Sequence, residues 1–372
     1  MSASEFERRT GRLRACLAER ELDAAVITRA PNIYYLSDFR ASAIASWTAR
    51  FHALIVPADG DARLLARSLE SESAGRQWTR DPLLWDDHED PYALVAGVLP
   101  QAADGGHLRL GVEKSHLSVA QLEHLSQALP GARFTDITGV TETLAAELSP
   151  AETGHMRRAA EVTAAGMRTA LEGVKVGAYP YEVIGRVHEA MYGAGQSDFE
   201  KSFVAIWSGP RGGMMHDTRT TQRFRAGDIA TIEIMGTDHQ YLACSQTCVP
   251  LGDRPPAAVR EAYDLIVKMH DAARAVVRAG VTAGQVFDAA NAVYRDRFGR
   301  DYFRRVGGSA GLTLFALDLV KGNQTELPAG TPLLVQTLVT EPVLLTCATT
   351  ILVTADGYDE LTPRIVWEDD PR

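Results

Sequence analysis

The chain has 372 residues, long enough for two domains that each bury a core. Its 45% hydrophobic and 23% charged residues are ordinary for a globular protein. The net charge of −10 does not favour binding to nucleic acid or to an anionic membrane surface. No apolar run reaches the roughly 20 residues that span a bilayer. Residues 1–14 lack the apolar stretch of a secretory signal, and the four cysteines form no CxxC pair. We expect a cytoplasmic protein with no nucleic-acid or membrane partner, no disulfide framework and no cysteine zinc site.

Residues 1–148 alternate helical and extended patterns. Residues 4–20 predict a helix with Phe6, Leu13 and Leu17 near one face, and the Pro-Asn pair at 31–32 predicts a turn. The other predicted elements are strands at 23–28, 51–57, 107–112 and 132–137 and a helix at 118–129. This alternation predicts a small α/β domain.

A second domain, residues 149–372, is predicted to begin where the chain reads Ser-Pro-Ala-Glu. Serine before proline, with a glutamate in the first turn, is a helix-start signature. Two helix-rich blocks follow, and each is succeeded by β-rich sequence. The blocks are 151–194 and 257–297, and the β-rich stretches are 199–250 and 312–354. The repeated order predicts an internal pseudo-duplication.

Residues 207–252 carry a family resemblance. A similar stretch in prolidase, aminopeptidase P and creatinase reads SG, a His, GD, a strand, a Gly-Tyr hairpin and a strand ending before Gly. The matching landmarks here are Ser208-Gly209, His216, Gly227-Asp228, Tyr241 and Gly252, with further similarity in PNIYYLSDF at 31–39, ELPAG at 326–330 and ILVTADGYDELT at 351–362. The chain resembles this family along nearly its whole length. The resemblance implies an α/β (α+β) protein, with a creatinase-type N-terminal domain followed by a pita-bread domain.

The resemblance also implies where the family's metal ligands would fall. Its metal-dependent members share the ligands Asp, Asp, His, Glu and Glu. The corresponding residues here are Glu233, Cys244, Gly308, Gln336 and Ala348 or an immediate neighbour of it, and a second family His falls near Phe315. One carboxylate, one thiol and one amide cannot replace a set of carboxylates and an imidazole. We therefore expect no metal and no other cofactor. The chain resembles the metal-free branch, creatinase and ectoine hydrolase, and IEIMG at 232–236 is similar to the latter's FEIAG-like pattern.

Two residues are candidate catalytic groups. His216 matches a His that creatinase keeps, and an imidazole suits general acid–base catalysis near neutral pH. The alternative is an ordinary hydrogen-bonded or exposed His. Glu233 lies in an apolar strand, where an unpaired carboxylate is unfavourable, so we expect a base or a nucleophile. The alternative is a structural Glu, paired with Arg211 or Arg219.

Five residues are candidate substrate-binding groups. Gln336 and Tyr241 face the same pocket by analogy with the family, and Trp47 lies in the loop that leads to Arg50. Arg50 is placed like a creatinase arginine that reaches the neighbouring subunit's active site and binds the substrate carboxylate there, a role that suits the planar guanidinium. The alternative is a solvated surface arginine. Cys244 is either a small buried side chain or, with a His beside it, a reactive thiol.

The resemblance and these residues predict metal-independent hydrolysis of a C–N bond (amidine, amide or guanidine) in a small carboxylated compound. The predicted assembly is a homodimer whose active site is completed by the partner's N-terminal domain. Three alternatives remain. The same pocket could carry out a lyase, isomerase or cyclisation step of specialised metabolism, or it could be a non-catalytic binding module. The third, a conventional metallopeptidase, is disfavoured by the missing ligands.

Overall fold

The computed structural model of the protein describes residues 3–40, 50–75, 78–79, 81–100, 107–198, 201–209, 221–252 and 254–367. The chain divides between Ala145 and Ala146 into two compact units, close to the predicted boundary at 148. Each unit has its own sheet and its own core.

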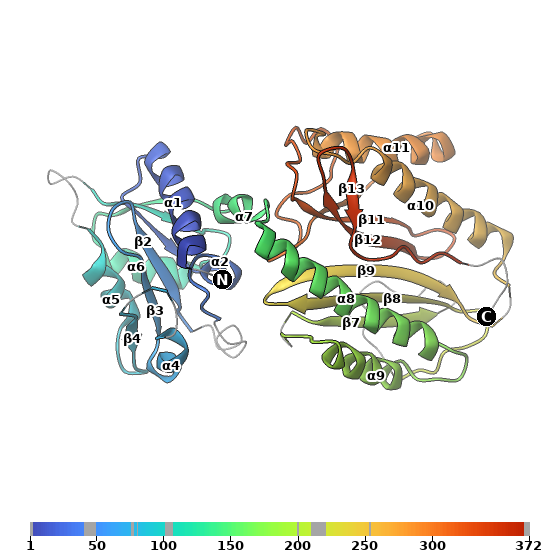
Figure 1. Ribbon diagram of the computed structural model, residues 1–372, viewed down its shortest axis with the longest axis horizontal. Helices are drawn as coiled ribbons and strands as arrows, with labels where there is room; N and C mark the ends of the chain where they lie inside the picture. The colour runs from blue at the N-terminus through green and yellow to red at the C-terminus, as the bar shows by residue number, and fades with distance from the viewer. Residues whose placement is uncertain are drawn as a thin grey trace. The chain divides into compact units, whose positions relative to one another are not determined.

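The first unit is built around a six-stranded mixed sheet (Figure 1). Its elements are α1 (Ala3–Glu19), β1 (Ala24–Ile27), α2 (Ala30–Ser37), β2 (Ala53–Pro57), β3 (Arg63–Arg67), the 3-10 helix η1 (Ser68–Glu70), α4 (Ser71–Ala74), β4 (Leu83–Trp85), α5 (Pro91–Val98), β5 (Arg109–Val112), α6 (Val119–Ala128), β6 (Arg133–Asp136) and α7 (Val140–Ala145). The strand order is β4-β3-β2-β1-β5-β6. Strand β1 is antiparallel to β2 and parallel to β5, so it lies at the centre of the unit's core.

Most predicted elements of this unit are confirmed. Helix α1 buries Phe6, Leu13 and Leu17, and the predicted helix at 118–129 is α6, which begins with a capping box at Ser118. The turn predicted at 31–32 is wrong, because these residues lie in the first turn of α2. Proline is tolerated there, since its missing N–H would have no partner within the helix.

The second unit contains a seven-stranded sheet and two helix pairs. Its elements are α8 (Pro150–Gly173), α9 (Pro180–Gly193), β7 (Phe203–Gly209), β8 (Ile229–Asp238), β9 (Tyr241–Pro250), α10 (Ala257–Ala275), α11 (Ala283–Phe298), β10 (Gly307–Ser309), β11 (Pro332–Val339), β12 (Leu345–Val353) and β13 (Tyr358–Glu360). The main order is β10-β11-β12-β9-β8-β7, with β13 beside β12. The unit has two halves, residues 150–250 and 257–353. Each half supplies two helices, an edge strand, a middle strand and a central strand, in the same order along the chain.

The helices cover one face of this sheet. Helix α8 packs on β8 and β9, α9 on β7, and α10 on β11 and β12 (Figure 1). Ile232 and Ile234 of β8 belong to the core beneath α8 and α9, and Val335 of β11 belongs to the core beneath α10. Because side chains alternate along a strand, Glu233 and Gln336 point to the opposite face. We call the side opposite these helices the inner face.

No helix among the described residues is both long enough and apolar enough to cross a membrane.

Candidate functional site

Four neighbouring strands bring a set of residues into line on the inner face. Glu233 of β8 is paired with Gln246 of β9. Gln246 is paired with Ala348 of β12, which is paired in turn with Gln336 of β11. Directly paired residues share a face of the sheet, so these side chains lie side by side although they are far apart in the sequence.

Hydrogen bonds join three of these residues to an arginine. Gln246 Nε2 donates to Glu233 Oε1 at 2.5 Å, and Gln336 Nε2 donates to Gln246 Oε1 at 2.7 Å. Arg304, which precedes β10, donates from Nη2 to Gln336 Oε1 at 2.9 Å. A guanidinium can only donate, so Arg304 fixes the orientation of Gln336 and, through it, of Gln246. We call Glu233, Gln246, Gln336 and Arg304 the polar row.

The polar row lies largely out of water, and its two ends differ in charge. Glu233, Gln246 and Gln336 are 7%, 6% and 4% exposed, and Arg304 is half-buried. Burial lowers the pKa of Arg304, and the negative charge of Glu233 is among the opposing effects. The row therefore places a carboxylate and a guanidinium at opposite ends of one hydrogen-bonded chain, with two neutral amides between them.

Cys244 lies two residues before Gln246 on the same strand face and is fully buried. Burial, and then the charge of Glu233, raises the pKa of this thiol well above its usual value. A neutral buried thiol fits the interpretation of Cys244 as a small packing residue better than that of a reactive nucleophile.

The residues at the family's metal-ligand positions do not fit a divalent metal. A Cβ atom on Gly308 would lie 2.4 Å from the Leu317 carbonyl oxygen and 2.7 Å from Phe315 Cδ1, so a His cannot stand there without moving the backbone. Ala348 has no ligand atom, and the Gln336 oxygen faces the positive charge of Arg304. Only Glu233 and a neutral thiol remain of the five positions.

Tyr241 does not share the site with Glu233, contrary to our prediction. It is the first residue of β9 and is paired with Asp238, whereas Glu233 is paired with Gln246, further along the strand. The odd separation between Tyr241 and Gln246 places them on opposite faces of β9. Tyr241 is fully buried, and its hydroxyl donates to Glu152 Oε1 at 2.7 Å. Its described contacts are therefore structural.

The structure does not test the roles predicted for three other residues. His216 and Trp47 lie outside the described residues. Arg50 belongs to the first unit, where it is exposed and its Nη1 lies 3.5 Å from Asp87 Oδ1. The roles proposed for these three residues stay predictions.

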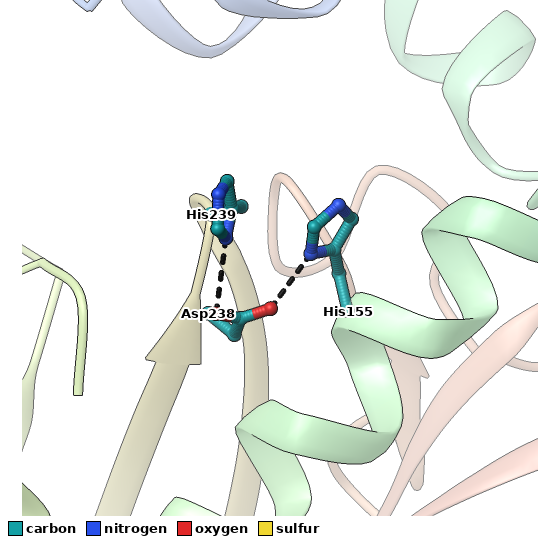
Figure 2. Close-up of side chains that lie close together, drawn as sticks. All are labelled: His155, Asp238 and His239. Carbon is teal, nitrogen blue, oxygen red and sulfur yellow. Dashed lines mark hydrogen bonds and ion pairs between the residues drawn. The ribbon is translucent and has the colours of Figure 1, made fainter. Parts of the chain in front are cut away.

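A second cluster of ligand-type side chains lies at the β8–β9 hairpin. Figure 2 shows Asp238 between His155 of α8 and His239 of the turn, with contacts of 2.6 Å and 3.0 Å to the two Nδ1 atoms. Among the described residues this is the one group of three that could hold a metal ion. Arg158, however, lies 2.8 Å from Asp238 Oδ2 and 2.7 Å from His155 Nδ1.

These contacts account for the hairpin cluster without a metal. Burial alone would raise the pKa of Asp238, but hydrogen bonds from His155, His239 and Arg158 outweigh it, and the pKa is lowered. The guanidinium already supplies a positive charge to two of the ligand atoms. We therefore interpret the cluster as an ion-paired carboxylate that stabilises the packing of α8 against the β8–β9 hairpin.

The chain belongs to metallopeptidase family M24. Residues 154–343, just over half of the chain, match the model of that family, and residues 9–144 match the creatinase/prolidase N-terminal domain. The match confirms the predicted fold and the predicted kinship with peptidases, and it places the chain in a family of hydrolases.

Particular relatives extend over most of the chain. The probable dipeptidase PepE of Mycobacterium tuberculosis is 29% identical over 335 residues, covering 88% of this chain and 86% of that protein. The crystal structure of dipeptidase PepE from Mycobacterium ulcerans has a TM-score of 0.84 at 26% identity and covers 98% of this chain and 97% of its own. The prolidase of Pyrococcus horikoshii, with a TM-score of 0.81 at 20% identity over 96% of this chain and 98% of its own, shares the fold.

Proposed function

We propose that the protein is a metal-independent hydrolase that cleaves a C–N bond in a small carboxylated compound. The observation that carries the proposal is the buried carboxylate of Glu233, held by Gln246 on an inner face whose other family ligand positions do not fit a metal. Membership of a hydrolase family supports the reaction type. Amidines, guanidines and amides are all candidates, and the names of the relatives make a dipeptide one of the amides to test.

In the proposed reaction, Glu233 acts on the carbon of the scissile C–N bond. As a general base, it takes a proton from water while the water oxygen bonds to that carbon. His216, outside the described residues, donates a proton to the leaving nitrogen, so that the C–N bond breaks and a neutral amine departs. In the covalent alternative, a Glu233 oxygen bonds to the carbon, the C–N bond breaks and the leaving nitrogen takes a proton from His216. Water then hydrolyses the resulting mixed anhydride or its nitrogen analogue.

The hydrogen bond from Gln246 has a definite role in this proposal. It orients the Glu233 carboxylate by occupying Oε1, which leaves the other oxygen for the reaction. Gln246→Leu should therefore reduce turnover without removing either catalytic group. Gln246→Glu should reduce it further, because a second carboxylate would face Glu233 directly across the two strands.

The test compares Glu233→Gln and His216→Ala with the unmodified enzyme. The substrates are Xaa-Pro dipeptides, ectoine and creatine, and the readout is release of amine in the presence of chelator. Each variant should lose at least ~100-fold in turnover, the usual scale for losing acid–base help. The double variant should be little worse than the worse single variant, because groups that act together are not additive. Near-normal turnover in both single variants on a substrate that the enzyme cleaves would refute the assignment.

Intact-mass spectrometry separates the two forms of the mechanism. After exposure of the His216→Ala protein to substrate, a stable adduct on Glu233 indicates nucleophilic attack. Its absence in a variant that still turns over slowly indicates general-base catalysis.

We also propose that the enzyme is a homodimer in which Arg50 of one subunit binds the substrate carboxylate in the site of the other. The family resemblance supports this arrangement. Mixing subunits that carry Arg50→Ala with subunits that carry Glu233→Gln tests it, because only the mixed dimer would hold one intact site.

A further inference from the structure

Arg304 has no direct anionic partner within the part of the chain that the structure describes. Its Nη2 donates to Gln336, whereas its Nη1 is buried and has no hydrogen-bond partner among the described residues. The adjacent Arg305 differs, since its Nε lies 3.6 Å from Asp318 Oδ1 and its guanidinium carbon lies 3.8 Å from the centre of the Phe315 ring. Arg304 is therefore a half-buried cation with one buried terminal nitrogen still to be satisfied.

A guanidinium in this position is unfavourable for folding, because part of its charge and its unused N–H groups have left water. Glu233 is an anion on the same face, yet Gln246 and Gln336 stand between the two charged groups and bond to each other. The polar row thus keeps the charges apart instead of letting them pair. A desolvated guanidinium with no anionic partner among the described residues is a feature of functional sites.

We propose that Arg304 is a second anion-binding group of the site, and that its Nη1 shares the carboxylate of the substrate with Arg50 of the other subunit. The inference rests on the proposed function, in which Glu233 acts at the scissile bond. A ligand carboxylate at Arg304 would use the remaining donor and neutralise the cation. It would also orient the rest of the molecule along the polar row toward Glu233.

The geometry favours a carboxylate over a phosphate. Gln336 already occupies Nη2, which leaves one terminal nitrogen of Arg304 for the ligand. With Arg304 and the proposed Arg50 as cations, and Glu233 and one ligand carboxylate as anions, the charges balance, whereas a phosphate dianion would leave one negative charge in excess. The preferred substrates therefore carry one carboxylate at a distance from the bond that is cleaved.

A first experiment measures stability and needs no substrate. Arg304→Met removes a desolvated cation that has no ion pair among the described residues, so the thermal midpoint should stay the same or rise by about 2–4 °C. Arg305→Met, the matched control, removes an ion pair and a ring contact, so its midpoint should fall. The double variant Arg304→Met/Gln336→Met removes the hydrogen-bond donor together with its acceptor. Its thermal midpoint should not fall below that of the wild type. If Arg304→Met and the double variant both lower the midpoint as much as Arg305→Met does, Arg304 is structural and the inference is wrong.

A second experiment measures anion binding with acetate as the probe. Acetate replaces chloride at constant ionic strength, and thermal midpoints are followed for the wild type, Arg304→Met and Glu233→Gln. The acetate-dependent rise should occur in the wild type and in Glu233→Gln and should be lost in Arg304→Met. An equal rise with and without Arg304, or no rise in the wild type, would overturn the inference.

The two experiments are independent of the reaction. Loss of the acetate effect in Arg304→Met supports the anion site even if no tested compound is hydrolysed. Conversely, hydrolysis that depends on Glu233 but is insensitive to Arg304→Met leaves the proposed function standing and removes this inference.

Discussion

Replacement of Gly308 by alanine tests whether the family's metal site is sterically closed in this chain. The added Cβ would stand 2.4 Å from Leu317 O and 2.7 Å from Phe315 Cδ1, both closer than real Cβ contacts. The carbonyl is not free to move, because it accepts a hydrogen bond from Ser309 N at 2.8 Å. Overpacking of this kind costs about 2 kcal/mol, which lowers the thermal midpoint of a unit of this size by roughly 4–8 °C.

The assay is thermal unfolding followed by circular dichroism, with Gly185→Ala as the control. Gly185 lies in α9, and a Cβ added there would have no atom within 4 Å, so alanine should be neutral or stabilising by up to about 1 kcal/mol. Gly308→His should be at least as destabilised as Gly308→Ala and should gain no metal affinity. A wild-type midpoint for Gly308→Ala would refute the reasoning, because the position would then accept a side chain and the steric argument against a metal centre would fail.

Three further predictions concern metal content, assembly and acid stability. Elemental analysis of the purified protein should find no stoichiometric Mn, Fe, Co or Zn, and chelator should not change turnover. The His155→Ala/His239→Ala variant removes the hairpin cluster as a source of metal. If metal is found and persists in this variant, it is bound at the inner face and the metal-free proposal is wrong. Light scattering should give a mass twice the chain mass of 40.4 kDa. Mixing Arg50→Ala subunits with Glu233→Gln subunits should restore some activity. A monomer at working concentration would contradict the proposed dimer. Burial lowers the pKa of His270 to about 3, below its unfolded value of 6.5, so stability should be lost as pH falls from about 6.5 toward 3 while the unfolded chain takes up the proton. His270→Gln should flatten this loss in pH-dependent denaturant unfolding, and an unchanged slope would show that His270 does not contribute to it.

The strands of the sheet cores were predictable because their apolar runs are bounded by turn residues. The predicted segments at 23–28 and 51–57 correspond to β1 and β2, which are fully buried. Strand β3 was missed because arginines at both of its ends mask a short apolar centre. The turn at 31–32 was wrong because proline begins a helix as readily as it makes a turn, and only the residues after it distinguish the two cases.

The candidate site was only partly predictable. Glu233 was predicted as a site residue because it falls at a ligand position of the family and because a lone carboxylate in an apolar strand stands out. Gln246 could have been predicted to lie beside it, because it follows Cys244 by two residues on one face. The prediction that Tyr241 lines the pocket was wrong. It followed from the family resemblance alone and did not take into account that side chains alternate between the two faces of a strand. The role of Arg304 could not be predicted from the sequence, because the residue lies outside any regular element. Its hydrogen bond to Gln336 depends on the register of the folded sheet.

The pseudo-duplication of the second unit has a consequence for how the protein opens. Glu233 and Gln246 belong to the first half, Gln336 and Arg304 to the second, and the two halves meet where β9 lies beside β12. Gln246 bridges this junction by accepting from both Gln336 and Thr346. Each half is contiguous in sequence and has its own helix pair, so a fluctuation can part β9 from β12 while both halves stay folded. Amide hydrogens at the junction should then exchange before those within either half, and mild denaturant should separate the carboxylate from the guanidinium while most of the helical signal remains.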